Sequence, residues 1–555
     1  MSGKRAFLDL LRQEGVKVMF GNPGTTELPL MDAFAVEDDI RYILGLQEAA
    51  LMAMADGYAQ ASGELAVLNL HVAPGLGNAM GMLYDAMKAN SPVLITAGQQ
   101  DLEYIATEPV LTADLATLAR PFVKWAAEVH RAEDLPRYVH RAVKTALAPP
   151  TGPVFLSLPG DILKNDADID LLEPTRVAPR LRGDAEAVAR AAEMLAKAER
   201  PVIIAGDAVA QSGAHKELVA LAEAVAAPVY VEFIPSRASF PASHPLYRGM
   251  MTRTQAGVRD VLEKHDLLFS VGGDLFTWSL PSKIDPWPAG LPLIHLDTDP
   301  WQIGKNFPAQ VAILGDPKAT LPDITAALDA RMSVSAKSAA QARLKSTADA
   351  IKKDLNAFRA KARAMAGKTP VQPHALLEAI GTMLPKDAVV IEEALSSAPG
   401  IRMLINSNDE QSFYGLRGGG IGWGLPAAIG VKVALPDRPV VALIGDGSAM
   451  YTIQALWTAA RYRLPIVWVI FNNTSYRILK QRLVMLRGLA EQADKFVGME
   501  LTDPAIDFIG LARSLGIEGQ RAKTVHEATD LIGKALKDGT AMVIDVDMER
   551  GYKPV

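Results

Sequence analysis

The sequence predicts an α/β protein made of three doubly wound domains, each built on a parallel sheet. The first observation is a recurring segment in which proline precedes an apolar, β-rich run that ends at glycine or a polar residue. Proline is tolerated as the first residue of a strand, and runs that are apolar on both faces are typical of parallel strands covered by helices. The segment occurs at 91–98, 152–160, 200–207, 227–233, 438–447 and 464–473.

Helical segments between these strands are the second observation. Stretches rich in Ala and Leu, such as 188–199 and 218–227, carry apolar residues at helical spacing. Strand and helix therefore alternate along nearly the whole chain. This alternation indicates crossover connections and parallel sheets with helices on both faces.

Length and local composition predict where the domains end. At about 150 residues per domain, a chain of 555 residues suggests three or four domains. A Pro-bearing stretch at 165–190 is polar, and a charged stretch at 333–372 is poor in large apolar residues. We expect domains at 1–175, 185–332 and 370–550, with 333–369 as a solvated, partly helical linker.

Composition excludes several classes of function. Hydrophobic residues make up 49% and charged residues 22% of the chain, as in ordinary globular proteins. A net charge of −6 gives no basic field for nucleic acid or anionic lipid. The sequence has neither a run of 18 apolar residues nor a secretory signal, and we expect no membrane association. The absence of cysteine excludes disulfides and thiolate chemistry, which fits a cytoplasmic enzyme.

Two polar turns follow neighbouring predicted strands near the end of the chain. GDGS at 445–448 follows the strand expected at 440–444, and Asn473 closes the strand expected at 466–471, with a helix expected at 451–462. Open α/β sheets bind ligands at the carboxyl ends of their strands, and a helix N-terminus favours phosphate. A lone GDG is more often an ordinary turn, but Asp446, Asn473 and phosphate oxygens together suit Mg²⁺. We therefore predict a metal that binds a diphosphate group.

Other nucleotide and nucleophile motifs fail. The glycine-rich stretch at 415–424 does not fit G-x-G-x-x-G, and GKT at 367–369 lacks the upstream glycine of a P-loop. No G-x-S-x-G elbow is present. A nicotinamide-dependent dehydrogenase is therefore not favoured.

GDGS followed after about 25 residues by two asparagines resembles the thiamine diphosphate motif of the decarboxylase and acetolactate synthase superfamily. Three further segments, 20–29, 44–63 and 68–81, resemble the pyrimidine-binding domain of that superfamily, most closely in the benzoylformate decarboxylase family. The segment 293–306 is more similar to the acetolactate synthase branch. The resemblance covers essentially the whole chain and implies a pyrimidine-binding, a middle and a diphosphate-binding domain.

The resemblance assigns catalytic roles to three residues of the first domain. Glu48 matches the glutamate that shares a proton with N1′ of the aminopyrimidine, so that the cofactor's thiazolium becomes a nucleophile. The alternative interpretation of Glu48 is an exposed charge on a helix. His71 matches a histidine that handles protons on the substrate, a task suited to imidazole, although a lone histidine is more often structural. Thr25 replaces a serine near the substrate and keeps its hydroxyl.

The resemblance also implies the residues that bind the cofactor and the metal. The metal ligands would be Asp446, Asn473 and the backbone oxygen of Ser475. Ile421 would bend the cofactor into its V shape. The remaining cofactor-binding residues would be Asn22, Pro23, Gly24, Ser396, Ser397, Gly420, Gly445, Gly447, Ser448 and Tyr476.

The substrate pocket departs from the pattern of the family. Ser279 stands where the family has a second active-site histidine, and a serine cannot replace an imidazole acid. Arg477, Ile478 and Arg482 replace small and aromatic residues near the pocket. Because arginine pairs well with carboxylates, we expect a more polar pocket than one built for a phenyl group, unless these arginines face solvent or another subunit.

The function expected from these residues is decarboxylation of a 2-keto acid to an aldehyde and CO₂, dependent on thiamine diphosphate and Mg²⁺. A carboligase or lyase of the acetolactate synthase or 2-hydroxyacyl-CoA lyase type is the alternative, and a flavin (FAD) requirement would favour the synthase. A non-catalytic cofactor-binding homologue is remote, since Glu48 and the metal motif are intact. The resemblance implies a homo-oligomer, with the dimer as the minimum active unit and a tetramer expected.

Overall fold

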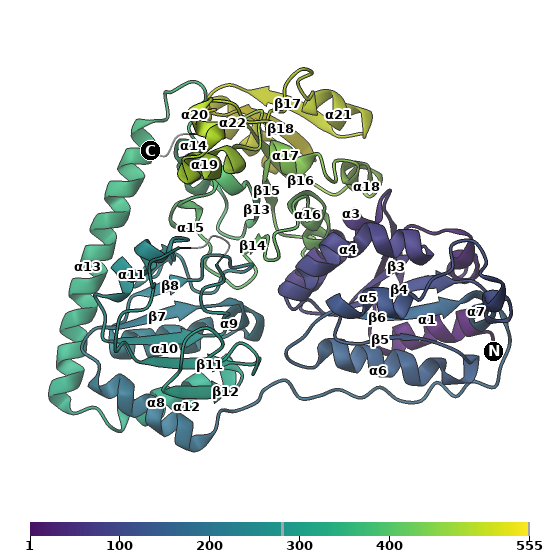
Figure 1. The fold of residues 1–555 in the computed structure, drawn as a ribbon, viewed down its shortest axis with the longest axis horizontal. Helices are drawn as coiled ribbons and strands as arrows, with labels where there is room; N and C mark the ends of the chain where they lie inside the picture. The colour runs from purple at the N-terminus through teal and green to yellow at the C-terminus, as the bar shows by residue number, and fades with distance from the viewer. Residues whose placement is uncertain (279–281, 553–555) are drawn as a thin grey trace.

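The computed structural model describes residues 1–278 and 282–552, and these residues form three six-stranded sheets (Figure 1). All strand pairs recorded within the sheets are parallel. Separate hydrophobic clusters lie on the two faces of each sheet, where helices cover it. The predicted fold class, three doubly wound parallel-sheet domains, is confirmed.

The N-terminal sheet has the strand order β2-β1-β3-β4-β6-β5. The runs predicted at 91–98 and 152–160 form β4 and β6, which are buried along their whole length. The strands are β1 Val18–Gly21, β2 Arg41–Leu44, β3 Ala66–Leu70, β4 Val93–Gln99, β5 Ala126–Glu128 and β6 Val154–Pro159; the helices are α1 Gly3–Gln13, α2 Leu28–Phe34, α3 Glu48–Ser62, α4 Val72–Lys88, α5 Leu115–Ala119, α6 Leu135–Leu147 and α7 Gly160–Lys164, with 3₁₀ turns at Thr25–Glu27, Leu102–Thr107, Arg120–Phe122 and Ala132–Asp134.

The middle sheet has the strand order β12-β11-β10-β7-β8-β9, and the chain reaches it along an extended segment after α7 (Figure 1). The order reverses direction between β7 and β10, where doubly wound sheets form a crevice at the carboxyl ends of the strands. The strands are β7 Pro201–Ala205, β8 Val229–Val231, β9 Tyr247–Met250, β10 Leu267–Val271, β11 Leu293–Asp297 and β12 Val311–Leu314; the helices are α8 Ala185–Lys197, α9 Asp207–Ser212, α10 His215–Val225, α11 Gln255–Leu262 and α12 Pro317–Asp329.

The C-terminal sheet has the strand order β14-β13-β15-β16-β18-β17, so the strands that precede the two polar turns, β15 and β16, are neighbours. The strands are β13 Val389–Glu393, β14 Phe413–Gly415, β15 Val440–Gly445, β16 Ile466–Asn472, β17 Glu518–Ala522 and β18 Met542–Asp547; the helices are α14 Pro373–Met383, α15 Ile401–Leu404, α16 Gly424–Ala434, α17 Asp446–Ala449, α18 Ala455–Arg461, α19 Arg477–Leu486, α20 Leu489–Gln492, α21 Phe508–Ser514 and α22 Val525–Asp538, with a 3₁₀ turn at Leu395–Ser397.

The helix expected at 451–462 is shorter than predicted. A first turn of helix, α17, begins at Asp446, and α18 starts only at Ala455. The hydroxyl of Thr452 donates a hydrogen bond to the carbonyl oxygen of Gly422, 2.6 Å away. This long-range bond holds the connecting residues in a turn, which no local sequence signal indicates.

The segment at 333–369 is more regular than the partly helical linker we expected. It contains one helix of 31 residues, α13 Val334–Ala364, which lies along the middle and C-terminal domains (Figure 1). Ion pairs tie it to both domains: Arg248 of the middle domain pairs with Asp354 at 2.6 Å, and Arg363 pairs with Glu378 of α14. The charged residues of this stretch therefore connect two domains.

The N-terminal and C-terminal domains meet through α3 and α16, which pack very closely. A Cβ atom on Gly57 would lie 2.4 Å from the carbonyl oxygen of Ala427, and one on Gly430 would lie 1.8 Å from that of Met54. Only glycine permits this approach of the two helix backbones. One hydrophobic cluster consequently runs through both domains.

Two further expectations concern Ser279 and membrane-spanning segments. Ser279 lies outside the described residues. None of the helices in the described ranges combines the length and hydropathy needed to cross a membrane.

Candidate active site

The turn after β15 places a buried carboxylate beside the end of β16. Gly445 pairs with Phe471 in the parallel ladder, so Asp446 follows directly beside the two asparagines. Asp446 is buried, and its Oδ1 accepts the Gly447 N–H at 2.9 Å. Its Oδ2 is also buried and has no hydrogen-bond partner among the described residues. Burial raises the pKa of Asp446 to about 6, despite N–H donors nearby that act in the opposite sense.

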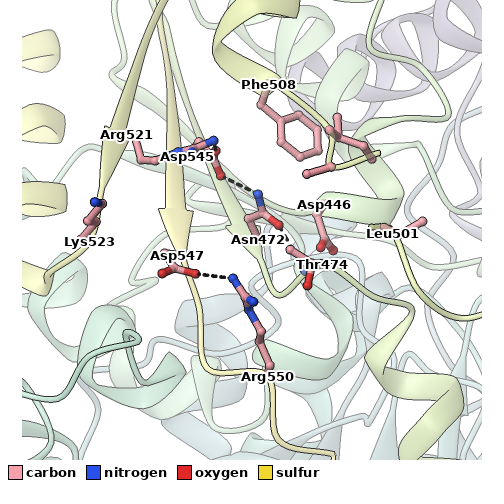
Figure 2. Close-up of a pocket in the computed structure, with 12 residues that line it drawn as sticks. Asp446, Asn472, Thr474, Leu501, Phe508, Arg521, Lys523, Asp545, Asp547 and Arg550 are labelled. Carbon is pink, nitrogen blue, oxygen red and sulfur yellow. Dashed lines mark hydrogen bonds and ion pairs between the residues drawn. The ribbon is translucent and has the colours of Figure 1, made fainter. Parts of the chain in front are cut away.

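The two asparagines have different partners. Asn472 donates to Asp545 of β18 at 2.9 Å and accepts the Thr474 N–H at 3.1 Å, as Figure 2 shows in part. Asn472 and Asp545 line a cavity of about 180 Å³ at the carboxyl ends of the last four strands. Asn473 is buried too, but among the described residues its Oδ1 accepts only the hydroxyl of Ser475, at 3.0 Å. The structure therefore leaves Asn473, and not Asn472, available as a ligand beside Asp446.

This arrangement fits Mg²⁺ bound with a diphosphate. The described residues contain no cluster of three Asp, Glu, His or Cys side chains suited to a metal. Mg²⁺ does not require one, because it takes one or two carboxylates together with phosphate oxygens and water. The unpaired Oδ2 of Asp446, the amide oxygen of Asn473 and backbone oxygens are hard donors of the right kind.

The remaining residues assigned to the diphosphate surround the same turn. The ring of Tyr476 packs against Gly447 so closely that a Cβ atom there would lie 2.6 Å from the ring. Ser448 is buried in α17 and hydrogen-bonds Glu393. Ser397 is buried, and its hydroxyl has no partner among the described residues, whereas Ser396 is half-buried. Gly445 caps α17 with an extended conformation.

The glycine-rich loop that carries Gly420 and Ile421 is held by buried carboxylates. Asp85 of α4 accepts the Gly420 N–H at 3.0 Å. Glu393, at the end of β13, accepts the N–H groups of Gly422 and Gly424, both at 2.5 Å. Burial raises the pKa of Asp85 to about 8 and that of Glu393 to about 7. Ile421, between these anchors, is half-buried.

Glu48 is the first residue of α3 and lies against α4. It is 9% exposed, which excludes the alternative of a solvated surface charge. The side chain of Asn78 on α4 donates to its Oε2 at 3.0 Å. A Cβ atom on Gly75 would lie 3.5 Å from Oε1, so the α4 backbone approaches this second oxygen closely.

His71 caps the N-terminus of α4 and pairs with a buried glutamate. Its Nδ1 lies 2.8 Å from Oε2 of Glu27, which also accepts the Gly24 N–H at 2.9 Å, while Oε1 accepts the Gly98 N–H at 2.9 Å. The carboxylate is surrounded by donors, so Nδ1 carries the imidazole proton and donates a hydrogen bond to Glu27. The other nitrogen, Nε2, is then the basic one. A Cβ atom on Gly24 would clash with the imidazole, so glycine is required there.

The other predicted residues of this turn lie near the surface of the single chain. Thr25 and Pro23 are exposed and Asn22 is half-buried. The neighbouring Thr26 makes the contacts: its hydroxyl donates to Glu27 at 2.7 Å and lies 3.3 Å from Nδ1 of His71.

The predicted pocket residues are separated by the structure. Ile478 and Ser396 line a cavity of about 390 Å³ between the middle and C-terminal domains, together with Arg253. Arg477 is instead buried against the C-terminal segment, with Nε donating to the carbonyl oxygen of Gly551 at 2.6 Å and a second bond to Glu549. The expectation that Arg477 lies in the substrate pocket, or faces solvent or another subunit, is therefore corrected. Arg482 is half-buried and is not among the residues that line this cavity.

Three residues that sequence reasoning missed complete the site. Glu27 fixes the tautomer of His71, Asn78 orients Glu48, and Glu393 anchors the loop of Ile421. The signal for Glu27 was available, since an acidic residue in a Gly-Thr turn before a helix is well placed to accept backbone N–H groups. For the other two, the contact depends on the packing of distant segments.

Comparisons with known proteins cover nearly the whole chain. Three family models match: the N-terminal TPP binding domain of thiamine pyrophosphate enzymes at residues 1–117, the central domain at 188–324 and the C-terminal TPP binding domain at 401–546. Benzoylformate decarboxylase of Pseudomonas aeruginosa is 35% identical over 98% of each chain. A probable acetolactate synthase large subunit of Methanocaldococcus jannaschii is 30% identical over 98% of this chain and 92% of its own.

A solved structure has the same fold over its full length. The thiamine diphosphate-dependent 4-hydroxybenzoylformate decarboxylase of Rhodococcus jostii is 32% identical, with a TM-score of 0.84, and all of both chains is covered. The polar turn at Asp446 and Asn473 lies in the matched C-terminal domain, and Glu48 and His71 lie in the matched N-terminal domain. With all three domains matched, the chain belongs to the thiamine pyrophosphate enzymes.

Proposed function

We propose that this protein decarboxylates a 2-keto acid without oxidation, using thiamine diphosphate and Mg²⁺, and releases an aldehyde. The observation that carries the proposal is the His71–Glu27 pair at the N-terminus of α4. It supplies a proton donor and acceptor that cofactor binding does not need. The similarity to a benzoylformate decarboxylase over 98% of each chain supports the same activity.

Each half of the site then has a separate task. Bound thiamine diphosphate supplies the electron sink for the departing CO₂. Asp446, Asn473 and the backbone oxygen of Ser475 would bind the metal that holds the diphosphate. Glu48 would hold a proton against the aminopyrimidine. His71 would move a proton at the substrate's carbonyl oxygen through Nε2, and Ile421 would pack against the bound cofactor.

The cavity of about 390 Å³ beside Ile478 and Ser396 is the proposed place for the side chain of the substrate. Its lining is mixed, because Arg253 and Glu392 occur together with Met250, Leu395 and Leu416. We therefore expect an acid with a sizeable, partly polar side chain. Arg253 takes over the role that we first expected of Arg477.

A carboligase or lyase is the second candidate, and Ser279 favours it. A serine at the position of the family's second histidine removes one proton donor, which allows the acyl group to be passed to another carbonyl compound. The acetolactate synthase relative, at 30% identity, agrees with this alternative. Within this candidate, a flavin requirement would favour the synthase type.

CO₂ release from a panel of 2-keto acids tests the two candidates. Purified protein with thiamine diphosphate and Mg²⁺ is given benzoylformate, 4-hydroxybenzoylformate, pyruvate and a dicarboxylic keto acid, and products are identified by mass spectrometry. We expect rapid CO₂ release with free aldehyde from at least one aromatic acid. Coupled products that form only with an acceptor aldehyde or CoA thioester would instead establish the second candidate.

Glu27→Gln is expected to lower kcat/KM by about 100-fold or more, with little change in the affinity for thiamine diphosphate. The glutamine keeps an oxygen for the Gly98 N–H, but the amide group that replaces Oε2 can donate to Nδ1 of His71. That contact places the proton on Nε2, the wrong nitrogen for the proposed base. His71→Ala should cause a similar loss, and His526→Ala, at a side chain that is 86% exposed, should cause none.

The affinity for the cofactor separates this role from a structural one. In E27Q, kcat/KM should fall while the unfolding temperature and the dissociation constant for thiamine diphosphate stay close to those of the wild type. An E27Q enzyme that loses stability and cofactor affinity together with activity would show that Glu27 only supports the fold.

A further inference from the structure

The crevice of the middle domain is filled from within the chain. It lies at the carboxyl ends of β7 and β10, where open α/β sheets bind their ligands. The cavity that remains there measures only about 20 Å³ and is lined by several carboxylates, Asp207, Asp274, Asp297 and Asp299 among them. A phosphate-bearing ligand would meet both too little space and charge of its own sign.

Arg417, from the loop after β14, occupies this crevice. Its side chain is 9% exposed. Its guanidinium lies 3.0 Å from Asp274, 3.4 Å from Glu232 and 3.7 Å from Asp207, and it also donates to the carbonyl oxygen of Ile234. The planar, five-donor group of arginine suits several acceptors at once. These carboxylates raise the pKa of Arg417, so its charge is permanent.

The acceptors are themselves fixed in place. Asp207 accepts two N–H groups, those of Ser236 and Arg237, and the hydroxyl of Ser236 at 2.6 Å. Glu232 is buried and accepts the Leu275 N–H at 2.6 Å. Their positions therefore do not adjust to a displaced Arg417. The anchor is rigid on the side of the middle domain.

Arg417 is only four residues from Ile421, in the same loop. The loop has two further anchors, Asp85 from the N-terminal domain and Glu393 from the C-terminal domain, which accept its backbone N–H groups. Arg417 is the contribution of the middle domain. Each of the three domains thus holds one part of the segment 417–424.

We propose that Arg417 is a positioning residue, which uses the ligand crevice of the middle domain as an anchor and thereby holds Ile421 in place for thiamine diphosphate. The inference rests on the proposed function, because it concerns the loop that would contact the cofactor. It assigns the middle-domain crevice to an internal side chain. It also excludes a flavin or nucleotide from this crevice while Arg417 is bound.

The test is the dissociation constant for thiamine diphosphate with Mg²⁺, measured by calorimetry on the full-length apoprotein. We expect Arg417→Gln to raise it about tenfold, as follows if the loop keeps its binding arrangement about a tenth of the time. Arg417→Lys should recover part of the affinity, because it restores the charge but not the planar fork. The matched control is Arg438→Gln, which breaks a bidentate pair with Asp409 away from the loop. It should lower the unfolding temperature without changing the dissociation constant.

A double-mutant cycle with Ile421→Ala identifies the route of the effect. If Arg417 acts through Ile421, the double variant should bind thiamine diphosphate no more weakly than I421A alone. Additive losses, or an R417Q dissociation constant equal to that of the wild type, would overturn the inference. Should R417Q not fold, Glu232→Gln replaces it: the glutamine still accepts the Leu275 N–H but loses the charge that faces Arg417. Failure of the wild type itself to bind thiamine diphosphate would instead overturn the proposed function.

Discussion

Glu48→Gln is expected to lower kcat/KM for 2-keto acid decarboxylation by at least about 100-fold. Glu48 is buried at the start of α3, where Asn78 donates to one of its oxygens at 3.0 Å. Glutamine matches the size of glutamate and can keep a hydrogen bond to Asn78. It cannot hold or pass a proton at the aminopyrimidine. The loss should therefore appear in the chemical step and not in folding.

Two measurements make this prediction specific. Steady-state rates should fall while calorimetry still detects binding of thiamine diphosphate and Mg²⁺. Glu64→Gln is the control, since Glu64 follows the same helix, has a half-exposed side chain and pairs only loosely with Lys17, at 3.4 Å. An E48Q enzyme as active as the wild type would remove Glu48 from the mechanism.

Much of the fold could be predicted because its signals are local. Strands such as β4, β6 and β16 begin directly after proline and are apolar on both faces, and helical spacing follows, so parallel sheets were the natural prediction. The metal site was also accessible, because Asp446 and Asn473 end two successive strands of one sheet. Adjacent parallel strands place their carboxyl ends together, and the register of β15 and β16 does so here.

The features that could not be predicted depend on contacts between distant segments. Arg477 follows the metal turn and looked like a pocket residue. The chain returns 72 residues later, and Glu549 pairs with it. No role was predicted for Arg417 in the glycine-rich stretch, yet its partners come from the middle domain more than 140 residues earlier. The ion-pair partners of a buried arginine come from segments that only tertiary packing brings close, and the residues adjacent to it in the sequence do not indicate them.

Asp446→Ala is expected to raise the dissociation constant for thiamine diphosphate by more than about 100-fold, even with Mg²⁺ present. The variant removes the buried Oδ2 that has no partner among the described residues, and with it the single carboxylate of the proposed metal shell. Chelation of the metal from wild-type enzyme should remove the same binding, and added Mg²⁺ should restore it. Asp545→Asn is the control, because Asp545 lines the cavity nearby but bonds Asn472 and Arg521. If D446A binds the cofactor as the wild type does, the proposed metal site is wrong.

The same two variants test how the halves of the site are assembled. We expect Glu48 of one subunit to act with Asp446 of another, so each single variant should be inactive as a homodimer. A heterodimer of E48Q and D446A subunits then contains one site with both substitutions and one site with neither. Co-expression with two affinity tags should therefore recover about half of the wild-type activity in the doubly tagged species, as two-fold symmetry requires. An inactive heterodimer would show that Glu48 and Asp446 of one site come from the same chain.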